Sequence, residues 1–112
     1  MARNEYGVLL DSNGYAPSVL QDDDGRCYYC GLPSEDLVRH EVFHGPNRDK
    51  SKALGTWVHM CPSCHDRLHR IDASMDWLVK RWGQMEAMKH YKWTIDSFRM
   101  MFGRNYLEET DK

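Results

Sequence analysis

The sequence has no long apolar run, and this absence argues against membrane-spanning and secreted classes of protein. No stretch approaches the roughly 18 consecutive apolar residues of a membrane span. The first residues, MARNEYGVLLDSNGY, contain no apolar segment of the length that a signal peptide needs. We therefore expect an intracellular, cytoplasmic chain without a membrane segment, in a reducing setting.

A large net charge of one sign is also missing. The chain has 15 Lys and Arg against 17 Asp and Glu, a formal net charge of −2, which argues against a uniformly basic protein that coats nucleic acid. The charges are unevenly distributed. Residues 21–38 contain five acidic residues and one arginine, whereas residues 39–70 contain six basic and three acidic residues. The basic excess therefore coincides with the segment that is rich in histidine.

Internal repeats and low-complexity runs are absent as well, and 112 residues correspond to about one domain. The pattern of residues 37–71 predicts strand, loop, strand and helix. LVRHEVF (37–43) and TWVHM (56–60) are typical of strands, HGPNRDKSKALG (44–55) of a loop, and Pro62 suits the first turn of a helix. In the N-terminal part, YGVLL (6–10) indicates a short strand, and DSNGY a turn in which Asn13 and Gly14 suit positive φ.

The C-terminal part is expected to form helices that brace the domain. Leu78, Trp82, Met85 and Met88 recur with helical spacing and predict a core-facing stripe. Thr94 is placed to cap a further helix whose face contains Ile95, Phe98 and Phe102, and Gly103 to end it.

Four cysteines form two CxxC pairs, Cys27 with Cys30 and Cys61 with Cys64. In a reducing compartment two such pairs favour a structural zinc site over disulfides. A thiol-disulfide protein is a weaker reading, because it does not explain a second pair. A two-Cys, two-His finger is also disfavoured, since it would leave Cys61 and Cys64 unused.

Two histidines remain after the cysteines are assigned. His65 and His69 are four residues apart and share one face of the predicted helix. A third donor is expected on the facing strand, where RHEVFH offers His40, Glu41 and His44. The sequence therefore predicts a second metal, whereas His59 and His90 read as ordinary surface or core residues.

The strings LVRHEVFHGPNRDKSKALGTWVHMCPSCHDRLH and FGRNYL resemble small HNH endonucleases of phages and prophages. The resemblance implies a small α+β fold: a ββα-metal (His-Me finger) hairpin, clamped by a four-cysteine zinc site and followed by C-terminal helices. Residues 25–72 would form the zinc-clamped nuclease domain, residues 1–24 an N-terminal extension, and residues 73–112 a helical brace of the same compact unit.

Carried over by position, the resemblance places His40 and Glu41 on the strand-one pair and His65 on the final histidine of the motif. His69 falls on a further helix histidine. It implies a catalytic divalent metal (Mg, Mn, Ni or Zn) held by His40, His65 and His69. The general base is left open between Glu41, His44 as the alternative, and His40 itself. Thr56 stands where the family usually has its middle Asn.

The function expected from these residues is metal-dependent hydrolysis of DNA phosphodiester bonds, with 5′-phosphate and 3′-hydroxyl products. The partners would be DNA and phage packaging proteins. The alternative is a catalytically degenerate HNH or zinc-ribbon module that binds DNA or a protein partner, which Glu41 and Thr56 favour. The basic residues expected to contact phosphates are Arg48, Lys50, Lys52, Arg67 and Arg70.

Overall fold

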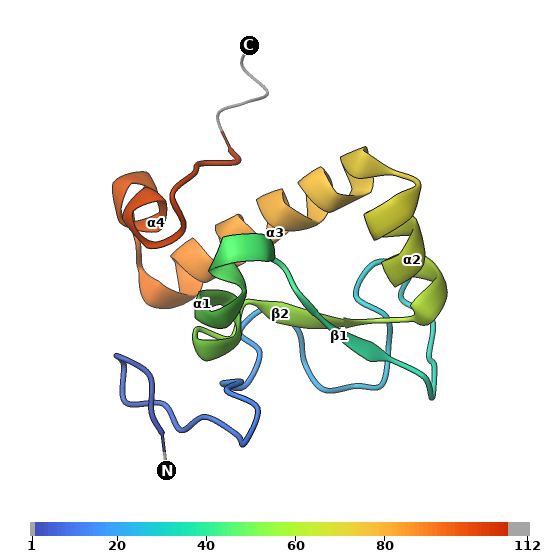
Figure 1. Ribbon diagram of the computed structural model, residues 1–112, viewed down its shortest axis with the longest axis horizontal. Helices are drawn as coiled ribbons and strands as arrows, with labels where there is room; N and C mark the ends of the chain where they lie inside the picture. The colour runs from blue at the N-terminus through green and yellow to red at the C-terminus, as the bar shows by residue number, and fades with distance from the viewer. Residues whose placement is uncertain (1, 108–112) are drawn as a thin grey trace.

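The computed structural model describes residues 2–107 and has a small α+β architecture. Figure 1 shows the chain order of the elements. They are the strand β1 (Val38–Glu41), the 3₁₀ turn η1 (Gly45–Asn47), the helix α1 (Arg48–Ala53), the strand β2 (Trp57–Met60), and the helices α2 (Pro62–Arg70), α3 (Ala73–Tyr91) and α4 (Ile95–Phe102). The coarse fold class expected from the sequence is therefore confirmed.

Strands β1 and β2 pair antiparallel, and their register decides which side chains share a face. His40 pairs with Val58, and Arg39 pairs with His59. Because side chains alternate along a strand, His40 lies on the buried face with Val58 and Met60, which are both fully buried. Arg39 and Glu41, on either side of His40 in the strand, lie on the opposite face.

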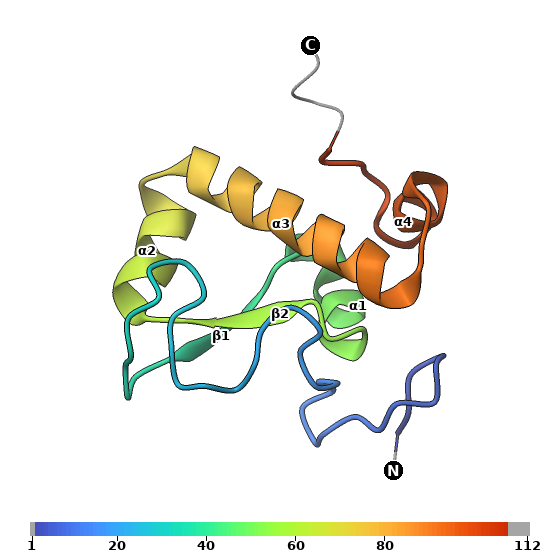
Figure 2. The ribbon, with the colours of Figure 1, turned by 180° about the vertical axis from the view of Figure 1, so that it is seen from behind.

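Helix α2 follows β2 directly, which gives a β-β-α order. The Cys61 side chain accepts from Cys64 N at the start of α2, and Pro62 occupies the first turn. In Figures 1 and 2 the long helix α3 crosses over the hairpin, with α2 at one end and α1 and α4 at the other. Phe43, Val79 and Phe98 are buried in the core between these layers.

The core face predicted for α3 was wrong for three of its four residues; Met88 is partly buried and packs against the core. Leu78 and Trp82 are each 38% exposed and Met85 is 53% exposed, whereas Gly83 and Gln84 are buried. A Cβ at Gly83 would lie 2.9 Å from Val42 Cγ1, so a residue without a side chain is needed where α3 crosses the segment after β1. Gln84 is buried because Asn105 and the Tyr106 backbone satisfy its amide.

Other local predictions were partly right. Thr94 caps α4 and Gly103 ends it with a φ of 82°, as expected, although Ile95 is 38% exposed. Gly14 has positive φ in its turn, but Asn13 does not. Residues 6–10 form no strand; the structure has an isolated bridge between Arg3 and Leu9. Residues 44–55 were expected to be a loop, yet they contain η1 and α1.

Within residues 2–107, no helix combines the length and the apolar character that a membrane crossing requires.

Candidate metal centres

The two CxxC pairs come together at one end of the hairpin. The four sulfur atoms, those of Cys27, Cys30, Cys61 and Cys64, all lie within 4.8 Å of one another. A tetrahedral zinc site with Zn–S bonds of about 2.3 Å needs sulfurs this close. The Tyr28 backbone N–H donates to the His59 carbonyl at 2.8 Å and ties the first pair to β2. All four cysteines are free, so their sulfurs can bind a metal.

The first pair is prepared for metal binding by its own backbone. Burial opposes ionisation of the Cys27 thiol, but backbone N–H groups of Cys30, Cys61 and Tyr29 outweigh it and lower the pKa to about 7. Thiolate is the form that binds zinc. Burial and side-chain hydrogen bonds with Cys61 and Cys27 instead raise the pKa of the Cys64 thiol. The cluster therefore has the sulfur geometry of a structural zinc site and, in Cys27, one thiol that ionises readily.

Three histidines form a second, separate cluster. Donor nitrogens of His40 on β1 and of His65 and His69 on α2 lie within 4.8 Å of one another. The His40 ring centroid is 5.2 Å from each of the other two. Nε2 of His65 and Nε2 of His69 are 3.2 Å apart. Two nitrogens bound to one ion by bonds of about 2.0–2.1 Å lie roughly this far apart.

The cluster also has the chemistry of a metal site. Nε2 of His40 is buried and, among the described residues, has no hydrogen-bond partner, which is costly unless a ligand satisfies it. Burial lowers the pKa of His40 to about 3, and His65 and His69 act in the same direction. Burial also lowers the pKa of His65 and of His69. Neutral imidazoles with free lone pairs are what a divalent ion requires.

His44 lies beside this cluster but outside the set of three converging donors. Its ring centroid is 5.3 Å from that of His69 and 5.7 Å from that of His40. Its Nε2 is 3.0 Å from Oδ1 of Asp76 on α3, and Oδ2 of Asp76 is 3.0 Å from Lys80 Nζ. Burial opposes ionisation of Asp76, but the hydrogen bonds from His44 and Lys80 prevail and lower its pKa.

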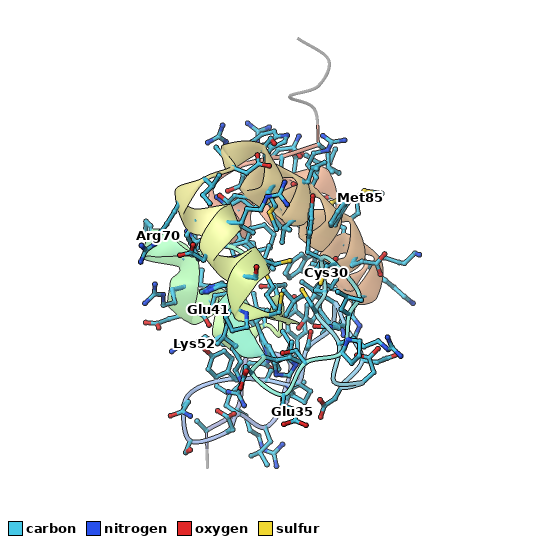
Figure 3. All side chains as sticks on the ribbon, turned by 90° about the vertical axis from the view of Figure 1, so that its right-hand side faces the viewer. Cys30, Glu35, Glu41, Lys52, Arg70 and Met85 are labelled. Atoms are coloured by element: carbon cyan, nitrogen blue, oxygen red, sulfur yellow. The ribbon has the colours of Figure 1, made fainter. Side chains whose placement is uncertain are left out.

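Glu41 is engaged on the other face of the hairpin. One carboxylate oxygen accepts a short hydrogen bond from the Tyr15 hydroxyl, and the other lies 3.5 Å from Arg48 Nε. Its negative charge opposes the lowering of the His65 pKa that burial causes, so Glu41 lies electrostatically near the cluster. Figure 3 shows Glu41 and Arg70 on one flank of α2 and Cys30 on the other.

Thr56, at the position of the usual Asn, is fully buried in a hydroxyl pair. Its Oγ1 is 2.8 Å from Ser51 Oγ, which also donates to the Thr56 carbonyl at 2.6 Å. The Phe43 backbone N–H donates to the same Ser51 oxygen. These contacts fix α1 against both strands. Asn47, the other asparagine of this segment, instead donates to the Phe102 carbonyl of α4.

The predicted phosphate contacts fall into two groups. Arg48 and Arg70 lie at the histidine cluster: the charge of Arg48 acts on His69, and Arg70 lines a cavity of about 520 Å³ with His65 and His69. The other three lysines and arginines make contacts elsewhere. Lys50 donates to the Met101 carbonyl, Lys52 lies over the Tyr15 ring, and Arg67 pairs with Asp72.

Two residues near the cluster were missed by the sequence analysis. Asp76 and Lys80 were assigned only to a helical brace, and nothing in their spacing pointed to His44. His59 and His90 lie outside the cluster: His59 packs on Trp57, and His90 packs on Tyr91.

Comparisons with models of protein families, with curated proteins and with solved structures found no match.

Proposed function

We propose that this protein is a metal-dependent endonuclease of the HNH type that hydrolyses DNA phosphodiester bonds, leaving a 5′ phosphate and a 3′ hydroxyl. The observation that carries the proposal is the convergence of His40, His65 and His69 beside a four-cysteine cluster on the same β-β-α unit. Both clusters use helix α2, so the zinc site would fix the helix that presents two of the three histidines.

The three histidines of the cluster fit a divalent ion. His40 would contribute its unpartnered Nε2, while His65 and His69 would contribute the two nitrogens that already face each other. Such an ion, when bound, neutralises charge on phosphate oxygens and lowers the pKa of water. An all-imidazole set favours Zn or Ni, while the resemblance to HNH enzymes admits Mg and Mn.

The protein's own side chains would supply the remaining needs of phosphodiester hydrolysis. Arg48 and Arg70 flank the cluster with exposed guanidinium groups, suited to hold the phosphates of a DNA strand. His44 lies next to the three donors with its ring held by Asp76, so it is the group best placed to orient the attacking water. Glu41 is a weaker choice because Tyr15 and Arg48 occupy both of its oxygens.

The position of Thr56 is compatible with activity. In the HNH pattern the middle Asn fixes the hairpin loop, and here the buried Ser51 hydroxyl ties α1 to both ends of that segment, through the Phe43 N–H and the Thr56 carbonyl. We infer that the hydroxyl pair serves the structural part of that role.

A zinc-ribbon binding module without catalysis is the second candidate. The engagement of Glu41 by Tyr15 and Arg48 favours it, because the second member of the strand-one pair is then unavailable for chemistry. The buried Nε2 of His40, which has no partner in the part of the chain that the structure describes, argues against it.

The endonuclease proposal also includes an origin in a phage or prophage, packaging proteins as partners and a cytoplasmic location. These three points rest on the resemblance and on composition.

The test is incubation of the zinc-loaded protein with supercoiled plasmid and Mg, Mn or Ni. His65→Ala serves as the control, with its folding checked by circular dichroism. Metal-dependent nicking that disappears in the folded variant supports the endonuclease. DNA binding without cutting under every metal condition would support the binding module instead.

A further inference from the structure

The contact between Asp76 and His44 joins two elements that lie far apart in the chain. His44 follows β1 at the start of η1, and Asp76 is in the first turn of α3, 32 residues later. Their side chains are only 29% and 21% exposed. A half-buried carboxylate held against an imidazole at the edge of a metal cluster is a recurrent arrangement for fixing the orientation of a histidine.

The hydrogen-bond pattern around Asp76 determines which nitrogen of His44 carries a proton. The Asp76 pKa is lowered, so its carboxylate is ionised at neutral pH and can only accept hydrogen bonds. Oδ1 faces Nε2 of His44, and Oδ2 faces the Lys80 ammonium. Nε2 must therefore carry the proton. In the neutral ring, Nδ1 is left with the free lone pair.

The ring that carries this lone pair lies on the side of the cluster from which α3 approaches. His44, His69 and Asp76 line one cavity of about 270 Å³. His69 also borders the larger cavity with His65 and Arg70. A small molecule in the cavity of about 270 Å³, such as a water, would lie between the His44 ring and His69, one of the three donors.

We propose that Asp76 is a positioning residue: it holds His44 in the tautomer with Nε2 protonated and Nδ1 free to accept a hydrogen bond from the attacking water. This inference rests on the proposed endonuclease function. It assigns to α3, which the sequence pattern marks only as a brace, a part in the reaction.

The decisive variant is Asp76→Asn. Lys80 can only donate, so its ammonium would retain the amide oxygen, and the amide NH₂ would then face Nε2 of His44. That donor forces Nε2 to accept, which moves the proton to Nδ1. The matched control is Asp96→Asn, because Asp96 also lies in the first turn of a helix, α4, and is exposed. It removes the same favourable interaction with a helix N-terminus.

The measurement is the tautomer of His44 in the zinc-loaded, ¹⁵N-labelled protein, from long-range ¹H–¹⁵N correlations, beside the rate of plasmid nicking and the affinity of the histidine cluster for Ni. We expect the Nε2-protonated form in wild type and in Asp96→Asn. We expect the Nδ1-protonated form in Asp76→Asn, with cutting slower by about 10- to 100-fold and Ni affinity unchanged. His44→Gln should lose a similar factor, and the double variant should lose no more.

An Nδ1-protonated His44 in the wild type would overturn the proposal without any variant, which covers the case of a misfolded Asp76→Asn protein. A flipped tautomer in Asp76→Asn with wild-type cutting would overturn it as well. If the wild-type protein fails to cut DNA with every metal tested, the proposed function itself is overturned. The tautomer data would then still decide whether Asp76 orients the ring.

Discussion

His40 and Glu41 are neighbours on β1 but face opposite sides of the hairpin, and only His40 meets the histidines of α2. His40 is 2% exposed, and its Nε2 has no hydrogen-bond partner within residues 2–107, while Glu41 is held by Tyr15 and Arg48. Alternation along the strand separates two residues that the family pattern treats as a pair. Their variants should therefore behave differently.

We predict that His40→Ala slows plasmid nicking by at least about 100-fold, because a donor of the metal cluster is lost. Glu41→Gln should be at least about 10-fold faster than His40→Ala, because Tyr15 and Arg48 already occupy its carboxylate. Rates are compared at saturating metal, with zinc content measured for each variant. Equal losses in the two variants would restore Glu41 as a catalytic group.

The four-cysteine cluster should be needed for folding rather than for chemistry alone. Structural zinc contributes an apparent binding free energy of about 10–16 kcal/mol in small zinc domains, comparable to the whole stability of a domain of about 5–15 kcal/mol. We predict that Cys64→Ser, or a strong zinc chelator, abolishes the cooperative thermal transition seen by circular dichroism. Adding zinc back should restore it after chelation. An unchanged melting temperature would contradict this role.

DNA binding should depend on the basic residues that flank the histidine cluster. Arg70→Gln is expected to weaken binding of duplex DNA and to reduce the slope of log affinity against log salt by about 1. Lys50→Gln should have a smaller effect, because Lys50 lies away from the histidine cluster, where it donates to the Met101 carbonyl. Fluorescence anisotropy over a salt series measures both quantities. A larger slope change for Lys50 than for Arg70 would place the DNA path elsewhere.

Tyr15 should make stability depend on alkaline pH. Burial and the hydrogen bond to Glu41 raise its pKa from 10.0 to about 12. The unfolded chain therefore loses this proton first as pH rises, and the stabilisation is complete below pH 10 and lost toward pH 12. The difference in unfolding free energy between wild type and Tyr15→Phe, from urea titrations, should shrink over that window. A constant difference would contradict the assigned shift.

The parts of the structure that could be predicted are those that depend on local chemistry. Cysteine spacing indicated one cluster, the i, i+4 spacing of His65 and His69 indicated another, and Thr94 and Gly103 marked the ends of α4. The structure brings together all of the residues assigned to the two clusters. Each of these signals lies within a few residues, so no knowledge of tertiary contacts was needed.

The parts that could not be predicted depend on distant partners. The buried face of α3 is set by Val42 against Gly83 and by Asn105 against Gln84. Apolar periodicity therefore selected a stripe of which Met88 alone packs against the core. Asp76 meets His44 only because α3 crosses the hairpin. Helix α1 was not predicted, because the Gly, Pro and Lys content of its segment is typical of a loop. The contact between the Ser51 and Thr56 hydroxyls holds the helix in place.

The central claim is that two metal sites of different character share helix α2. Native mass spectrometry of the protein loaded with zinc and then with Ni tests it most directly, with His65→Ala beside the wild type. The account predicts two bound ions in the wild type and one, the zinc, in a folded His65→Ala protein. A single ion in the wild type, or two ions retained in His65→Ala, would contradict it.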